Sequence, residues 1–89
     1  MLTRELTPDE QEFVTMLISA LPPVIARKDV FRFLGGVVAP KTLANADDEG
    51  NGPEIAYKVG RSVAYRTDSL VTWLVIKFGV ARIPNVKAF

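Results

Sequence analysis

The sequence of 89 residues contains no cysteine and no histidine. Without cysteine the chain can form no disulfide, thiolate nucleophile or thiolate metal site, and without histidine it lacks the commonest metal ligand and general base. The carboxylates show no pairing that suggests acid–base catalysis, and no hydroxyl residue has a base beside it. We therefore predict that the protein is not an enzyme and holds no metal and no cofactor.

A long apolar run is also missing. The most apolar stretch, residues 70–81, is interrupted by Thr72, Lys77 and Gly79, and no basic run leads into an apolar segment at the N-terminus. These features predict a cytoplasmic protein without a membrane partner. A length of 89 residues with 48% hydrophobic content predicts one small core. It leaves no room for an effector domain, so we expect no small-molecule ligand.

The formal net charge of +1 conceals an uneven distribution. Residues 1–21 carry one basic and four acidic side chains, whereas residues 53–89 carry six basic and two acidic ones. A basic half beside an acidic segment suits a polyanion partner, and it equally suits a charge-matched protein dimer.

A capping box begins the first predicted helix. Thr7 stands at the N-cap, Pro8 at the first helical position and Glu10 at N3, which is a sequence pattern typical of helix N-termini. Apolar residues follow at three- and four-residue spacing until Pro22-Pro23 ends the helix. We interpret this helix as a packing or dimer-forming element.

Two shorter helices are predicted next, over residues 27–34 and 40–46. Gly35-Gly36 ends the first, and Pro40 suits the first position of the second. Two short helices joined by a glycine-containing turn form a helix-turn-helix pattern. In the 27–34 helix we expect Val30, Phe31 and Leu34 to face inward and Arg27, Lys28 and Arg32 to face outward. Residues 47–53 are predicted to form an acidic, solvated loop, which is no calcium loop because its twelfth position is Lys58 instead of Glu.

Residues 54–66 alternate with a period of two and predict a β-hairpin. If both strands bury their apolar side chains on one face, Tyr57 pairs with Tyr65 and Val59 with Val63. That register requires a three-residue connection over residues 60–62, with Lys58 and Arg66 on the outer face and Arg61 at the tip. A last helix is predicted from a Thr67 cap to about Phe78, apolar on two sides and therefore sandwiched or self-associating, with Trp73 in the core. Residues 79–89 are expected to be an extended tail.

The order of these residues resembles the excisionase and MerR-like family of winged helix-turn-helix domains. The resemblance covers residues 25–74 and is carried by Pro40, Lys41, Thr42, Leu43, Gly50, Pro53, Lys58, Gly60, Arg61, Tyr65, Arg66, Asp68, Leu70, Trp73 and Leu74. It implies a mainly α fold with a small β-hairpin, in the order helix, helix, helix, hairpin wing, helix. The expected division is an N-terminal helix at 1–23, the winged domain at 24–78 and a tail at 79–89.

In that family the second helix of the pair enters the DNA major groove and the wing lies on the backbone or in the minor groove. The resemblance therefore implies a recognition helix at about 40–46 and a wing at about 58–62. It implies sequence-specific binding of double-stranded DNA by a small transcriptional regulator or an excisionase-like recombination directionality factor, associated with the nucleoid. The expected DNA-binding residues are Lys41, Thr42, Ala44 and Asn45 on the helix, Lys58, Arg61 and Ser62 on the wing, and Arg27, Lys28 and Arg66 beside them.

Asn45 is the best candidate for reading an adenine, because its amide donates and accepts at once. One small domain covers little DNA, so we expect a homodimer or cooperative assembly on repeated sites, with the helix at 1–23 as the assembly surface.

Three features depart from the family pattern. Ala39 offers no capping side chain, residues 36–38 lengthen the turn, and Asp47-Asp48-Glu49 would repel a phosphate backbone. The alternative is a winged-helix module that binds proteins and has no affinity for DNA.

Overall fold

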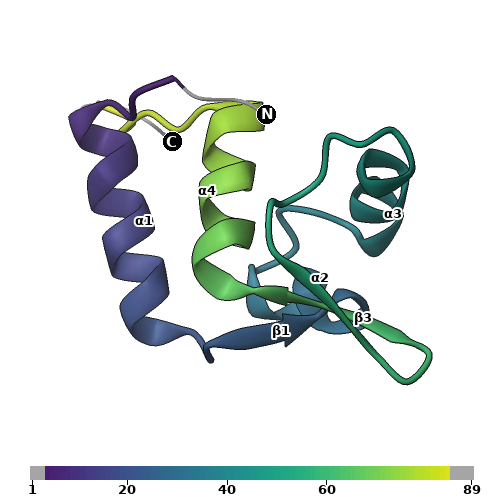
Figure 1. Cartoon of the computed structure of the whole chain (residues 1–89). Coiled ribbons are helices and arrows are strands. Elements are labelled where there is room, and N and C mark those ends of the chain that lie inside the picture. Colours follow the sequence, from purple (N-terminus) through teal and green to yellow (C-terminus); the bar gives the residue numbers. More distant parts are fainter. Residues whose placement is uncertain (1–3, 85–89) are drawn as a thin grey trace.

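The computed structural model describes residues 4–84 and shows a small α/β domain with four α-helices and a three-stranded antiparallel sheet within that range (Figure 1). None of the helices in the described part is long and apolar enough to cross a membrane. In chain order the elements are α1 (Pro8–Ala20), β1 (Val24–Ala26), the 3-10 helix η1 (Arg27–Asp29), α2 (Val30–Phe33), α3 (Pro40–Asp48), β2 (Ala56–Val59), β3 (Ser62–Arg66) and α4 (Thr67–Phe78).

The capping box predicted for α1 is confirmed. The Thr7 hydroxyl accepts from the Glu10 backbone N–H at 3.2 Å, and Glu10 Oε1 accepts from the Thr7 N–H at 2.9 Å. These reciprocal bonds satisfy two backbone donors that a helix start otherwise leaves unpaired. The helix ends at Ala20, just before Pro22-Pro23.

Helix α4 lies beside α1 along its length and is buried on two sides (Figure 1). Val71 and Val75 pack with Val14 of α1, whereas Leu70 and Trp73 belong to the larger core on the other side. The predicted sandwiching of this helix and the predicted core position of Trp73 are both confirmed.

The start of α4 differs from the prediction. Arg66 occupies the N-cap position, and Thr67 is the first helical residue. The Thr67 hydroxyl donates to the Pro22 carbonyl oxygen, and the Thr67 N–H donates to the Pro23 oxygen at 2.9 Å. Thr67 therefore joins the start of α4 to the corner after α1 and does not cap its own helix.

The sheet contains one strand more than the predicted hairpin. Its order is β1-β3-β2, so β3 is central, and Ile25 of β1 pairs with Tyr65. Strand β1 has only three residues, too few for an alternating pattern to be recognised in the sequence. The predicted combination of helices and a β-hairpin is therefore found within a small α/β domain, in which β1 adds a third strand to the hairpin.

The hairpin register also differs from the prediction. Val59 pairs with Ser62 and Tyr57 with Ala64, so the turn contains the two residues Gly60-Arg61. Gly60 has a φ of 62° and Arg61 has no positive φ, a combination that suits a type II′ turn with glycine first.

The cause of the error is the assumption that both strands bury their apolar residues on one face. Tyr57 and Val59 are 46% and 62% exposed, on the face opposite the buried Tyr65. Because paired residues share a face, Lys58 lies opposite Val63 on the Tyr65 side of the sheet and not on the outer face.

The predicted 27–34 helix is split into η1 and α2. Val30 and Leu34 are buried as predicted, but Phe31 is 52% exposed. Residues four apart share a helix face, whereas the next residue is rotated by about 100°. The inward position predicted for Phe31 is therefore wrong.

Helix α3 continues two residues beyond the predicted end, so Asp47 and Asp48 are helical and do not belong to a loop. Leu43 and Ala46 fix α3 to the core, where both are buried. Ala39 precedes the helix without a side-chain cap, as the sequence predicts.

Candidate nucleic-acid interface

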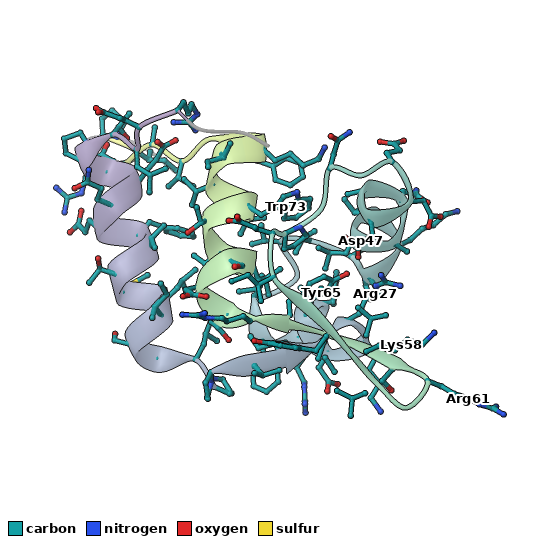
Figure 2. The ribbon with its side chains drawn as sticks, viewed as in Figure 1. Arg27, Asp47, Lys58, Arg61, Tyr65 and Trp73 are labelled. Carbon is teal, nitrogen blue, oxygen red and sulfur yellow. The ribbon has the colours of Figure 1, made fainter. Side chains whose placement is uncertain are left out.

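Most of the predicted site residues lie on two elements at the same end of the molecule. Lys41 and Asn45 are exposed on α3, with Thr42 and Ala44 half-buried beside them. Lys58, Arg61 and Ser62 are exposed on the hairpin, and Arg61 extends from the tip of the turn (Figure 2). Figure 1 shows α3 and the hairpin on one side of the molecule and α1 on the opposite side.

The first turn of α3 is suited to an anion. It contains Pro40 at N1 and no acidic residue, and Lys41 is exposed there. The positive end of the helix dipole and the side chain of Lys41 therefore act in the same direction.

Arg27 is half-buried and bonded within the protein, which corrects the prediction that it faces outward. Its Nη2 donates to Asp47 Oδ2 at 2.6 Å and its Nε donates to the Tyr65 hydroxyl at 2.9 Å. The Tyr65 hydroxyl in turn donates to Asp47 Oδ2 at 2.6 Å. Arg27 and Asp47 are 26% and 25% exposed, and Figure 2 shows the three side chains converging between α3 and the sheet.

The ionisation of this cluster follows from its surroundings. Burial, followed by the hydrogen bond to Asp47, raises the pKa of Tyr65 to about 12. The hydrogen bond to Tyr65, with that to Asp47, raises the pKa of Arg27. At neutral pH the phenol is therefore protonated and the guanidinium is charged, so each donor required by the three hydrogen bonds is present.

The remaining predicted residues are placed differently. Lys28 is exposed on η1. Arg66 pairs with Val24 at the end of β3 remote from the turn, and its Nε lies 3.0 Å from Asp68 Oδ1. The structure therefore does not bring Arg66 together with the hairpin tip.

The three acidic residues after Ala46 lie in different environments. Asp47 is occupied by Arg27 and Tyr65, whereas Asp48 and Glu49 are exposed at the C-terminal end of α3. Sequence reasoning missed the pairing of Asp47, because both partners are far from it in the chain. The segment therefore presents fewer unpaired carboxylates than its composition indicates.

A groove of about 880 Å³ lies between the loop after α3 and the side of α4. Its lining includes Ile55, Ile76 and Trp73, whose Nε1 donates to the Asn51 carbonyl oxygen at 2.6 Å. Arg66 is the one predicted site residue that lines it. The groove was missed because residues from two distant segments form it. Within residues 4–84, no group of three acidic side chains is arranged to hold a metal ion.

Comparison of the chain with protein families, curated proteins and solved structures finds no match. Its function is therefore inferred from its own residues and their geometry.

Proposed function

We propose that this protein binds double-stranded DNA as a small winged helix-turn-helix domain. In this proposal α3 enters the major groove and the β2–β3 turn contacts the backbone or the adjacent minor groove. The observation that carries it is the presence of α3 and the hairpin tip at one end of the molecule, each with exposed basic or amide side chains.

The dimensions and chemistry of α3 support this role. An α-helix with its side chains is about 10–12 Å in diameter, which fits a major groove about 12 Å wide, and the nine residues of α3 give a length of roughly 14 Å. Lys41 and Asn45 are four residues apart and share one helix face. On that face Asn45 is available for bidentate hydrogen bonds to adenine, and Lys41 for a phosphate or a guanine.

The hairpin register favours joint contact by both elements. Lys58 lies on the same face of the sheet as Tyr65, the residue that reaches α3 through Asp47. Lys58 is thus on the α3 side of the hairpin, with Arg61 beyond it at the tip. A duplex seated against α3 would meet both positive charges, which suits phosphate contacts.

A single domain of this kind covers roughly 600–1,000 Å² of DNA-facing surface. Specific binding in the cell therefore calls for two copies or cooperative binding to repeated sites. We propose a role as a transcriptional regulator or a recombination directionality factor, both of which act by occupying or bending a site.

The test is fluorescence anisotropy of a labelled mixed-sequence duplex at about 50 and about 200 mM salt. With about four phosphate contacts, the affinity should fall with a log–log slope near −3.6. Lys58→Ala and Arg61→Ala should each weaken binding and reduce the slope by about 0.9. Lys77→Ala removes the same charge from α4 and should leave the slope unchanged.

A protein-binding module is the second candidate. It is favoured by the exposed Asp48 and Glu49 on α3 and by the exposed apolar Tyr57 and Val59 on the outer face of the hairpin. Absence of duplex binding by the folded protein at about 50 mM salt would select this candidate over DNA binding.

A further inference from the structure

Asp47 occupies an unusual position for a residue of an exposed acidic segment. Its Oδ2 accepts hydrogen bonds from Arg27 of η1 and from Tyr65 of β3, both at 2.6 Å. Tyr65 is fully buried, and Arg27 also bonds to its hydroxyl. One carboxylate oxygen therefore connects three elements of the fold.

We propose that Asp47 is the positioning residue of the DNA interface, and that it sets the orientation of α3 relative to the hairpin. This inference rests on the proposed DNA binding. In the proposed complex Asp47 does not contact DNA. It acts through α3, to which it belongs, and through β3, to which it is hydrogen-bonded.

The position of Asp47 on α3 supports this role. At about 100° per residue, Asp47 lies about 200° from Asn45 and about 240° from Lys41. Asp47 thus faces the protein while Lys41 and Asn45 face solvent. Leu43 and Ala46 hold α3 by apolar contacts, which are non-directional. The two bonds to Asp47 are directional and restrict rotation of the helix about its own axis.

Tyr65 links Asp47 to the hairpin. Tyr65 belongs to the central strand, which continues to Ser62 at the turn. A shift of β3 would therefore move the turn and the Tyr65 hydroxyl together. The carboxylate of Asp47 consequently couples the placement of the turn to the placement of α3.

The loop that follows α3 also confines the Asp47 carboxylate. A β-carbon added at Gly52 would collide with Asp47 Oδ1, so the loop backbone encloses the second carboxylate oxygen. The carboxylate is therefore confined by η1, β3 and its own following loop. Gly52→Ala provides a way to displace it without changing any charge.

Asp48 provides a matched control for the test. It is the next residue of the same helix and carries the same charge, but it is exposed and lies seven residues from Lys41, on the same face. If only net charge mattered, Asp47→Asn and Asp48→Asn would both strengthen binding, because each removes a negative charge near DNA. If Asp47 positions α3, the two substitutions change the affinity for DNA in opposite directions: Asp47→Asn weakens binding and Asp48→Asn strengthens it.

The experiment measures the anisotropy of the mixed-sequence duplex with full-length wild type and variants, after circular dichroism has established that each is folded. We expect Asp48→Asn to tighten binding and Asp47→Asn to weaken it about tenfold. Tyr65→Phe keeps the ring and removes the hydroxyl, and Gly52→Ala displaces the carboxylate, so both should also weaken binding. In the Asp47→Asn background, Lys41→Ala should lower the affinity for the duplex by a smaller factor than it does in the wild type.

The outcomes separate the two proposals. If the wild type does not bind the duplex, the proposed function fails. If the wild type binds and Arg61→Ala weakens it, but Asp47→Asn behaves like Asp48→Asn, the function stands and the positioning role of Asp47 is overturned. Should Asp47→Asn not fold, Tyr65→Phe tests the same proposal. The proposal is rejected if Tyr65→Phe binds the duplex as tightly as wild type and if Lys41→Ala lowers the affinity of that variant by as much as it lowers that of wild type.

Discussion

At the scale of single residues, Glu10 is the most completely satisfied carboxylate of the fold. It forms a bidentate pair with Arg4 at 2.8 and 2.9 Å and accepts from the N–H groups of Thr7 and Val80. The Arg4 guanidinium, and after it the Thr7 N–H, lower the pKa of Glu10 from 4.5 to about 2. Arg4 also donates to the Val75 carbonyl oxygen, so this group connects the start of α1 with the end of α4.

A pH dependence of stability follows from Glu10. A carboxyl whose pKa is lower in the folded state stabilises the fold while it is ionised. This contribution is complete above pH 4.5 and is lost as the pH falls to about 2. Glu10→Gln should therefore lower Tm strongly near neutral pH, and its difference from wild type should shrink across that window, as measured by thermal denaturation.

Glu12→Gln is the control for this prediction, since Glu12 is exposed and its nearest cation, Arg82, lies 3.6 Å away. Exposed pairs of this kind contribute little. A difference between wild type and Glu10→Gln that stays constant from neutral pH to pH 2 would contradict the assignment.

The residues show which interactions a sequence can reveal. The Thr7–Glu10 capping box is local, so spacing alone predicts it. The other bonds of Glu10 and Asp47 are not local in this sense. Arg4, the partner of Glu10, also bonds to Val75, and Arg27 meets Asp47 only once the chain has folded. No spacing rule identifies such pairs, and the sequence of the acidic segment therefore suggests one more unpaired carboxylate than the structure contains.

At the scale of elements, the hairpin depends on its turn. Gly60 has a φ of 62°, which costs an L-residue about 1–2 kcal/mol. Gly60→Ala should therefore destabilise the protein by about that amount in urea denaturation. Arg61→Ala changes the other turn residue, which needs no positive φ, and should remain within about 0.5 kcal/mol of wild type. Equal effects of the two substitutions would contradict the two-residue turn.

The attachment of α3 rests on a few buried side chains. Leu43 is fully buried, and Leu43→Ala should lower the free energy of unfolding by about 2–5 kcal/mol, a large part of the total for a small domain. Val59→Ala shortens an exposed side chain on the outer face of the hairpin and should change stability by less than about 0.5 kcal/mol. Urea denaturation compares them, and a small effect of Leu43→Ala would mean that α3 is not held by the core.

The elements also show where sequence patterns suffice. Helices α1 and α4 are bounded by strong signals, a capping box and two prolines for α1 and Gly79 for α4. The predicted extent of α1 and the predicted end of α4 are confirmed, and α4 begins one residue earlier than predicted. Strand β1 is too short to show a period. The register of β2 and β3 was mispredicted because exposed Tyr57 and Val59 look identical in sequence to buried residues.

At the scale of the whole molecule, the longest extent is 47 Å, and α1 and the hairpin lie on opposite sides of the fold. Exposed acids such as Glu5 and Glu12 belong to the α1 side, and Lys58 and Arg61 to the hairpin side. Surface charges interact over about 8 Å at physiological salt and about 30 Å at 0.01 M. Under the proposed DNA binding, the acidic side would therefore influence the affinity of the opposite end for DNA only in dilute salt.

The double variant Glu5→Gln/Glu12→Gln tests this separation. Under the proposed DNA binding, its affinity should equal that of wild type at physiological salt and rise roughly twofold at about 0.01 M. Asp48→Asn, beside the interface, should tighten binding at both concentrations. Tighter binding by the double variant at physiological salt would place DNA near α1 and contradict the orientation proposed for the complex.

The strand order β1-β3-β2 has a consequence for biosynthesis. Val24 pairs with Arg66, so β1 emerges from the ribosome ahead of its neighbour, with a delay of about 2–8 s at about 5–20 residues per second. During that interval α1 has no α4 to pack against, and a single helix of 13 residues is marginal in water. The packing of Val14 against Val71 and Val75 therefore forms only after α4 has emerged.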